Sequence, residues 1–229
     1  MVMDCCGSIF LNRAYRGGQT VLARHRHVEA YLALVLSGGY EEAGDRGCFR
    51  VKAGDVVLHS AYEAHIDRYN ATGAEVLDLA LPRWATFAHA TMHIADPDAI
   101  VRSVERDPRE ALNMVLALMR PAERAVDDWP HRLAGDLERN PHLRFGAWAR
   151  DHHLADATLS RGFQRVFGVT PNAYRAQQRA LHATRMAATS RASLTDIAHT
   201  TGFVDQAHMT HAVRTLTGQT PGQWRRQSA

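Results

Sequence analysis

The sequence predicts an α+β protein, with a small N-terminal β-barrel followed by an all-α domain that contains two helix-turn-helix units. Three observations predict this fold class. Short β-type runs separated by glycine fill residues 9–90, a helical stretch follows, and one helical pattern occurs twice between residues 143 and 225. The length of 229 residues favours two domains, and a hydrophobic content of 45% is enough for a core in each.

The N-terminal region contains four β-type runs. They are Thr20–Ala23, Tyr31–Leu36, Asp55–His59 and Glu75–Leu81, the last of which is stopped by Pro82. We interpret the glycines around them as turns, namely Gly17-Gly18, Gly38-Gly39, Gly44, Gly47, Gly54 and Gly73. Many short strands at this spacing are typical of a small sandwich or barrel.

Residues 96–120 change to a helical pattern. Asp96-Pro97 and Asp107-Pro108 each place a capping side chain before a proline at the first helical position. An apolar stripe at helical spacing follows, made of Leu112, Val115, Leu116 and Met119. This stripe is expected to dock either on the β-barrel or on a second subunit, which would form a homodimer. Pro121 and residues 127–130 end the region and are interpreted as a linker.

The C-terminal pattern repeats at an offset of 50 residues. Leu159-Ser160-Arg161 corresponds to Met209-Thr210-His211, Gly168–Pro171 to Gly218–Pro221, and Tyr174-Arg175 to Trp224-Arg225. Upstream the offset is 49, because Ala149 corresponds to Ala198. Each copy has the pattern of a helix-turn-helix, which indicates sequence-specific DNA binding. The alternative is a duplicated helical hairpin that serves only for packing.

The second helix of each copy is the candidate recognition helix. In the later copy it spans about residues 205–217, with Met209, Ala212, Val213 and Leu216 on its inner face, after a helix that Ser193 can cap. In the earlier copy the inner face consists of Leu159, Phe163 and Phe167, and Asp156 can cap the helix. Pro171 opens a connecting helix over residues 171–188.

Polar side chains occupy the outer faces of these two helices, where such groups can read base edges or hold phosphates. The residues predicted to contact DNA are Thr158, Ser160, Arg161, Gln164 and Arg165 in the first copy and Gln206, His208, Thr210, His211 and Arg214 in the second. For Arg165 and Arg214 simple solvation is the alternative.

Charge and composition agree with this interpretation. Residues 136–229 carry a net charge of +6 and residues 1–135 a net charge of −3, so the positive charge lies beside the predicted recognition helices. The sequence has no 18-residue apolar run and no signal-peptide pattern at its start. Its three cysteines, Cys5, Cys6 and Cys48, give no disulfide framework. We therefore expect no membrane contact and a cytoplasmic location.

The C-terminal part resembles the AraC/XylS family of bacterial transcription regulators. The matching motifs are Leu159-Ser160-Arg161-x-Phe163, Phe167-Gly168-x-Thr170-Pro171-x-x-Tyr174, Ile197-Ala198-x-x-x-Gly202-Phe203-x-Asp205-Gln206 and Gly218-x-Thr220-Pro221-x-x-Trp224-Arg225. The resemblance implies two recognition helices in successive major grooves of double-stranded DNA, and RNA polymerase as a partner. The chain departs from the family pattern at Ala155 and Val204, where serine is usual, and at His211 and Val213, where arginine and phenylalanine are usual.

The N-terminal part looks like a cupin barrel, the usual sensor fold of this family. His25-Arg26-His27 resembles the first half of the cupin motif, and residues 53–59 with His65 resemble the second. Metal-binding cupins add a glutamate four residues after the second histidine of the first half. Tyr31 occupies that position here, and Glu29 is near but out of register.

Two kinds of ligand fit these residues. The candidate effector-binding residues are His25, His27, Tyr31, His59 and His65. Of these, His25, His27 and His65 are the candidate ligands of a divalent metal ion such as Zn²⁺, Ni²⁺ or Fe²⁺. The alternative is that the histidines bind an organic effector or each other through hydrogen bonds.

The sequence thus predicts a transcription regulator, by family resemblance an activator, that a small molecule or metal controls. Its predicted parts are a cupin-like sensing domain at residues 1–95, a helical connector with a dimerisation role at 96–135 and a double helix-turn-helix DNA-binding domain at 136–229. We expect no enzymatic activity and no catalytic residues. The alternative is a metal-dependent cupin enzyme fused to a DNA-binding domain.

Overall fold

The computed structural model describes residues 11–85, 87–122 and 124–227. Cys5 and Cys6 lie outside this range. The chain divides into two compact units. The β unit comprises the chain up to Val126 except two short segments, 44–47 and 62–64, which group with the helical unit that starts at Asp127. The division therefore differs from the predicted boundaries at residues 95 and 136.

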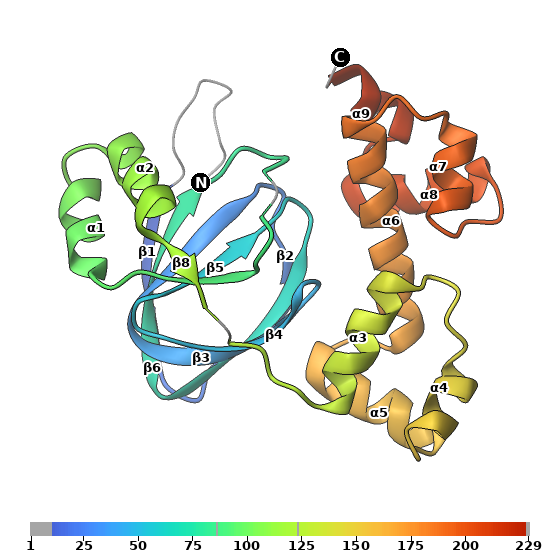
Figure 1. Cartoon of the computed structure of the whole chain (residues 1–229), viewed down its shortest axis with the longest axis horizontal. Helices are drawn as coiled ribbons and strands as arrows, with labels where there is room; N and C mark the ends of the chain where they lie inside the picture. Colours follow the sequence, from blue (N-terminus) through green and yellow to red (C-terminus); the bar gives the residue numbers. More distant parts are fainter. Residues whose placement is uncertain (1–10, 86, 123, 228–229) are drawn as a thin grey trace. The chain divides into compact units, whose positions relative to one another are not determined.

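The β unit is an eight-stranded sheet that curves strongly (Figure 1). Its strands are β1 (Leu11–Arg16), β2 (Val21–Arg26), β3 (Tyr31–Gly44), β4 (Gly47–Lys52), β5 (Asp55–His59), β6 (Ala64–Ala80), β7 (Thr91–His93) and β8 (Arg120–Pro121). The strand order is β1-β6-β3-β5-β7-β8, while β2 pairs with β6 and β4 with β3. The predicted α+β class is confirmed, and along the described strands the sheet is open, with β1 and β8 at its two ends.

Two of the predicted turns are wrong, because the glycines lie inside long strands. Gly38 lies within β3 and Gly73 within β6, with φ angles of +68° and +70°. A Cβ atom on Gly38 would lie 1.9 Å from the carbonyl oxygen of Gly73. Glycine therefore bends each strand and lets the two backbones approach closely. Both strands continue beyond the bend, so residues 40–44 belong to β3.

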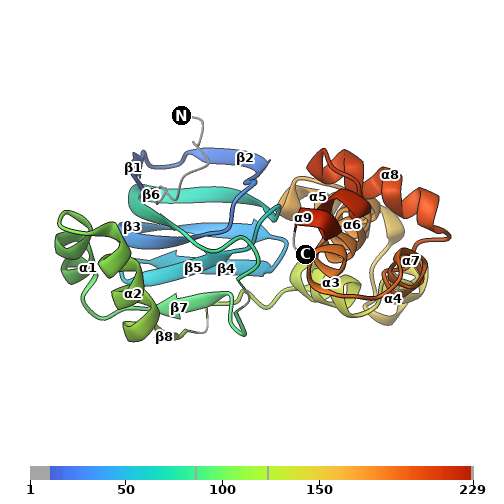
Figure 2. The same ribbon diagram turned by 90° about the horizontal axis from the view of Figure 1, so that it is seen from above.

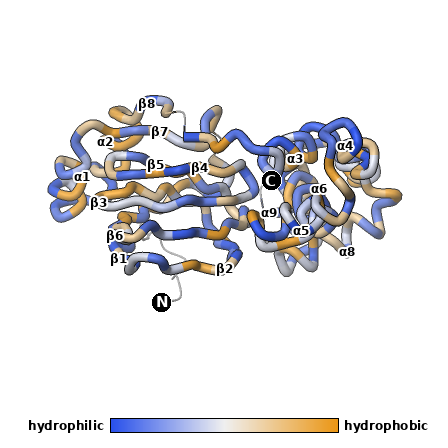
Figure 3. Tube along the Cα trace, turned by 90° about the horizontal axis from the view of Figure 1, so that it is seen from below, coloured by the Kyte–Doolittle hydropathy of each residue, from blue (hydrophilic) through white to orange (hydrophobic). Residues whose placement is uncertain are grey.

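The core of the β unit follows its central strands. Figure 3 shows hydrophobic stretches along β3, and every residue of β5 is buried. Residues of β3, β4, β5 and β6 share one hydrophobic cluster, which includes Val35, Phe49, Val57 and Val76. Polar side chains among these strands are consequently held in a largely desolvated interior.

Helices α1 (Pro97–Val104) and α2 (Pro108–Leu118) begin as predicted, with the Asp96 and Asp107 side chains capping them. Figure 2 shows both helices beside the sheet, within the β unit. The apolar stripe of α2 is only partly covered. Val115 is buried, Leu112 and Met119 are half-buried, and Leu116 is 38% exposed. The stripe thus packs in part on its own unit, and its role in dimerisation stays a prediction.

The described residues of the helical unit form seven helices. They are α3 (Trp129–Arg139), α4 (Phe145–Asp151), α5 (Asp156–Phe167), α6 (Pro171–Thr189), α7 (Leu194–Thr200), α8 (Gln206–Thr217) and α9 (Pro221–Gln227). The long helix α6 contacts α3, α5, α7, α8 and α9, so it links the two repeats. No helix among the described residues is long and apolar enough to cross a membrane.

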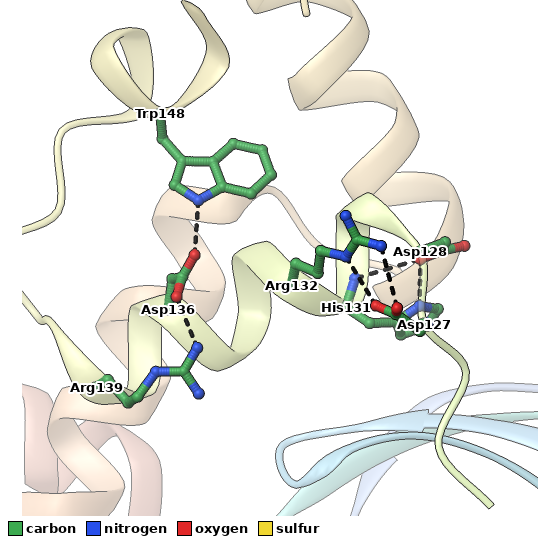
Figure 4. Close-up of polar contacts among 7 residues, drawn as sticks. All are labelled: Asp127, Asp128, His131, Arg132, Asp136, Arg139 and Trp148. Carbon is green, nitrogen blue, oxygen red and sulfur yellow. Dashed lines mark hydrogen bonds and ion pairs between the residues drawn. The ribbon is translucent and has the colours of Figure 1, made fainter. Parts of the chain in front are cut away.

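The predicted linker at residues 127–130 is instead the start of α3. Asp128 is its N-cap and Pro130 lies in its first turn. Backbone N–H groups of the first turn make no hydrogen bond within the helix, so proline is tolerated there. The predicted boundary at residue 136 therefore falls inside this helix. Figure 4 shows how Asp136 anchors α3: its carboxylate accepts hydrogen bonds from Trp148 Nε1 at 2.8 Å and from Arg139 at 2.7 Å.

Candidate functional site

Each repeat folds as a helix-turn-helix. We call α4–α5 the first helix-turn-helix unit and α7–α8 the second. Ala149 and Ala198 are buried at equivalent places on the supporting helices. Their carbonyl oxygens accept hydrogen bonds from the backbone N–H groups of Leu154 and Phe203, at 2.8 and 2.9 Å. The turn needs a positive φ, which Gly202 adopts at +81° in the second unit and His153 at +56° in the first.

The recognition helices bury the faces that the sequence predicts. Leu159, Phe163 and Phe167 are buried in α5, and Met209 and Val213 in α8. Both helices end at a left-handed glycine, Gly168 or Gly218. Ser193 caps α7 as predicted. Asp156 does not cap α5, because the N-cap position falls on Ala155.

The repeated arginines have a structural role that the sequence does not reveal. Arg175 donates a hydrogen bond to the carbonyl oxygen of Leu143 at 3.0 Å. Arg225 does the same to the carbonyl oxygen of Ala192 at 2.6 Å. Each arginine thereby fastens the chain just before the supporting helix of its own unit. These charges are consequently engaged within the fold.

The predicted DNA-contacting residues lie on the outer faces of the two recognition helices. Eight of them are exposed, namely Thr158, Arg161, Gln164, Arg165, Gln206, His208, His211 and Arg214, whereas Ser160 and Thr210 are half-buried. Asp205 accepts a hydrogen bond from the backbone N–H of His208 at 2.7 Å and so fixes the start of α8. The structure thus presents hydroxyl, amide, imidazole and guanidinium groups on each helix, and their contacts with DNA stay a prediction.

The β unit contains a cavity of about 290 Å³. All five predicted effector-binding residues line it, namely His25, His27, Tyr31, His59 and His65. Their rings form a continuous group. Tyr31 stacks on His59 with ring centroids 4.4 Å apart, and His65 lies 4.6 Å from His59 and 4.3 Å from His25. The five predicted side chains therefore lie together in the structure, and their role stays a prediction.

Burial controls the charge of these groups. It lowers the pKa of His27 to about 4, with the nearby His25 adding to the effect. Burial also holds the pKa of His65 well below its ordinary value, and neighbouring histidines reinforce the shift. In the same cavity, burial raises the pKa of Asp78 to about 6. His27 and His65 are consequently neutral at pH 7, the form in which imidazole binds metal ions.

Two sets of side chains could hold a metal ion, and they share His65. One is the predicted set of His25, His27 and His65. The other consists of Glu42, His59 and His65, and Glu42 was not predicted. Glu29, the carboxylate closer to the family position in sequence, pairs with Arg83 instead.

Glu42 is not predicted from the sequence because Gly38-Gly39 has the pattern of a turn. That turn would end the strand before Tyr40 and Glu42, whereas β3 carries both into the cavity wall. The alternation of side chains on a strand would have identified them if the strand had been extended through the glycines. Other lining residues that the sequence did not indicate are Asn12, Arg16, Tyr69 and Asp78.

Comparison with known proteins supports the assignment of the helical unit. A family described as a helix-turn-helix domain matches residues 148–227. The virulence regulon transcriptional activator VirF of Yersinia enterocolitica is 30% identical over 112 residues, which are 48% of this chain and 41% of that protein. The chain thus spans about two fifths of the length of this relative.

Two solved structures are similar at lower identity. A transcriptional regulator with an AraC-type DNA-binding domain from Chromobacterium violaceum is 23% identical, covering 42% of this chain and 88% of that chain, with a TM-score of 0.40. ToxT from Vibrio cholerae is 8% identical, covering 96% of this chain and 98% of that chain, with a TM-score of 0.44. The family match by itself shows that residues 148–227 form a helix-turn-helix domain.

Proposed function

We propose that this chain is a sequence-specific transcription regulator of the AraC type, controlled by a small molecule or a divalent metal ion. The observation that carries the proposal is the pair of helix-turn-helix units, each with an exposed polar face on its recognition helix. In a helix-turn-helix unit the second helix enters the major groove and contacts base edges, while neighbouring cationic side chains bind phosphates.

The cavity of the β unit supports the control by a ligand. It is lined by buried polar groups that can bind a ligand, among them Tyr31, His59 and His65. Regulation requires that the ligand bind one arrangement of the chain more tightly than another, since a ligand with equal affinity for both shifts nothing. The description of VirF as a transcriptional activator supports activation. RNA polymerase as a partner rests on the resemblance of the sequence motifs to the AraC/XylS family.

The test of DNA recognition begins with a cognate site, selected from random DNA with the full-length chain. Arg161→Ala and His208→Ala should each weaken binding to that site by about 1–3 kcal/mol, roughly 5- to 150-fold, and weaken binding to random DNA much less. Arg102→Ala on α1 is the matched control, since it removes an exposed charge far along the chain from the recognition helices. Binding is measured by fluorescence anisotropy at one fixed salt concentration.

Three outcomes are informative. Equal losses on cognate and random DNA would show that Arg161 and His208 hold phosphates rather than read bases. A loss with Arg102→Ala as large as the others would show a non-specific effect of charge. Failure of the selection to enrich any sequence would contradict the proposed function itself. Circular dichroism of each variant checks that the helices remain folded.

A further inference from the structure

We infer that the metal site of the cavity is formed by Glu42, His59 and His65, rather than by His25, His27 and His65, the set that the sequence suggested. This inference deepens the proposed function, because it rests on the cavity being a ligand site and names the residues that hold a divalent metal ion there. The Glu42 carboxylate and two imidazoles make up the donor set.

Three different strands position these ligands. Glu42 lies on β3, His59 at the end of β5 and His65 at the start of β6, and they are 3%, 6% and 4% exposed. One ligand atom from each lies within 4.8 Å of the others. A metal at the centre of such a triangle needs each atom to move inward by about 0.7 Å to reach the ordinary bond length of roughly 2.1 Å. Rotamer adjustment supplies shifts of this size.

Charge favours this set over the predicted one. A buried carboxylate is costly unless a positive charge compensates it. His59 Nε2 lies 3.6 Å from Glu42 Oε2, so the carboxylate and the imidazole face each other across a short gap. A divalent cation between the two would compensate the charge at bonding distance. The predicted set contains three imidazoles and no carboxylate.

His65 carries an independent sign of a missing ligand. Its Nδ1 is buried and makes no hydrogen bond within the described part of the chain. Its Nε2 lies 3.7 Å from Asp67 Oδ2, which is too far for a direct hydrogen bond. In a metal-binding histidine one ring nitrogen holds the metal, while the other usually faces a carboxylate, a carbonyl group or water. The geometry around His65 therefore fits a metal ligand better than a residue that only packs.

His25 and His27 fit a metal less well. Both are only partly buried, on the end of β2 and just after it. The metal-binding role therefore moves to the deeper residues, where two imidazoles and one carboxylate suit Zn²⁺ or Fe²⁺ and leave open coordination positions.

The experiment measures metal stoichiometry of the full-length, tag-free chain. The protein is stripped with a chelator, reloaded with Zn²⁺ or Co²⁺, desalted and analysed by elemental mass spectrometry. We expect about one equivalent in the wild type, in His25→Ala and in His27→Ala, and at least a tenfold loss of affinity in Glu42→Gln and His59→Ala. Glu29→Gln is the matched control, since it alters another carboxylate of the same cavity and should retain the metal.

The opposite pattern overturns the inference. Metal lost in His25→Ala or His27→Ala but kept in Glu42→Gln would assign the site to the predicted histidines, and loss in all four variants would deny a distinct site. If circular dichroism shows that Glu42→Gln does not fold, the metal content of His59→Ala and the visible spectrum of the Co²⁺-loaded protein test the site instead.

DNA binding of the same preparations separates this inference from the proposed function. A wild-type chain that binds its DNA site but takes up no metal overturns the metal site and leaves the regulator. A chain that binds metal as expected but no DNA does the reverse.

Discussion

In the first helix-turn-helix unit aromatic rings hold the recognition helix, whereas in the second unit smaller side chains and helix caps do so. Phe163 and Phe167 stack with centroids 4.5 Å apart, and both contact the ring of Tyr174. At the corresponding positions the second unit has Val213, Thr217 and Trp224. The same backbone plan is therefore stabilised by different interactions.

The N-terminal caps of the helices differ in the opposite direction, since the second unit has more of them than the first. Within the described residues, neither α4 nor α5 has a side-chain cap, whereas Ser193 caps α7 and Asp205 caps α8. Each satisfied backbone N–H contributes about 1 kcal/mol to helix stability. The second unit thus offsets its smaller core with caps, which shows that a duplicated fold retains its geometry while its stabilising contacts change.

The two units also hold a buried tryptophan in different ways. Trp148 Nε1 donates to the Asp136 carboxylate at 2.8 Å, and Trp224 Nε1 donates to the Thr217 hydroxyl at 3.0 Å. A carboxylate titrates and a hydroxyl does not. The two units should therefore respond differently to acid.

The largest expected difference concerns the cores. Phe163→Ala should lower the free energy of unfolding by about 3–5 kcal/mol, and Val213→Ala by about 2 kcal/mol, because fewer buried carbon atoms are removed. Urea denaturation of the full chain, followed by far-UV circular dichroism, measures both. Equal losses at the two positions would contradict the view that the first unit depends on its aromatic core.

Exchanging the caps should produce an intermediate effect. Asp205→Ala should destabilise the second unit by about 1 kcal/mol, and Ala155→Ser should stabilise the first by a similar amount. Ala155 already has the extended backbone of an N-cap, with φ −74° and ψ 145°. Thermal denaturation measures both changes. Ala155→Val, which cannot cap, is the control, and a gain as large as that of serine would disprove the capping explanation.

Acid should produce the smallest difference. Burial raises the pKa of Asp136, but hydrogen bonds from Trp148 and Arg139 outweigh it, so the pKa lies below its ordinary value of 3.8. The resulting stabilisation is complete above the unfolded pKa and is lost as the pH falls through the folded one. Because the group is partly exposed, we expect less than about 1 kcal/mol.

The measurement compares melting temperatures between about pH 6 and pH 3. Asp136→Asn should reduce the fall in melting temperature with acid, while Thr217→Val should lower the melting temperature equally at every pH. If the melting temperature of Asp136→Asn falls with acid as steeply as that of the wild type, other carboxyl groups control acid stability.

Local signals in the sequence predicted much of this fold. The strand Asp55–His59 and the caps at Asp96, Asp107 and Ser193 follow from neighbouring residues alone, and the structure has them as expected. The paired helices follow from the repeat. These features depend on contacts within a few residues, which a single sequence displays directly.

The misinterpreted features depend on distant residues. A glycine that ends a strand and one that bends it look alike in sequence, and the close approach of Gly38 to Gly73 distinguishes them. The position of Glu42 near His59 is likewise not visible in the local sequence, because the β3–β5 register places Tyr31 opposite His59 and Glu42 lies far along β3 from that pair. Proline is similarly ambiguous, since Pro130 opens α3 although the sequence suggested a linker.

Helix α6 imposes a constraint on how this chain can change over time. It contacts helices of both units along one continuous stretch from Pro171 to Thr189. Each residue of an α-helix adds about 1.5 Å and 100° of rotation. Inserting or deleting one residue in α6 would therefore rotate one recognition helix relative to the other by about 100°. Loops of the β unit can vary in length, whereas the number of residues in α6 has to stay constant.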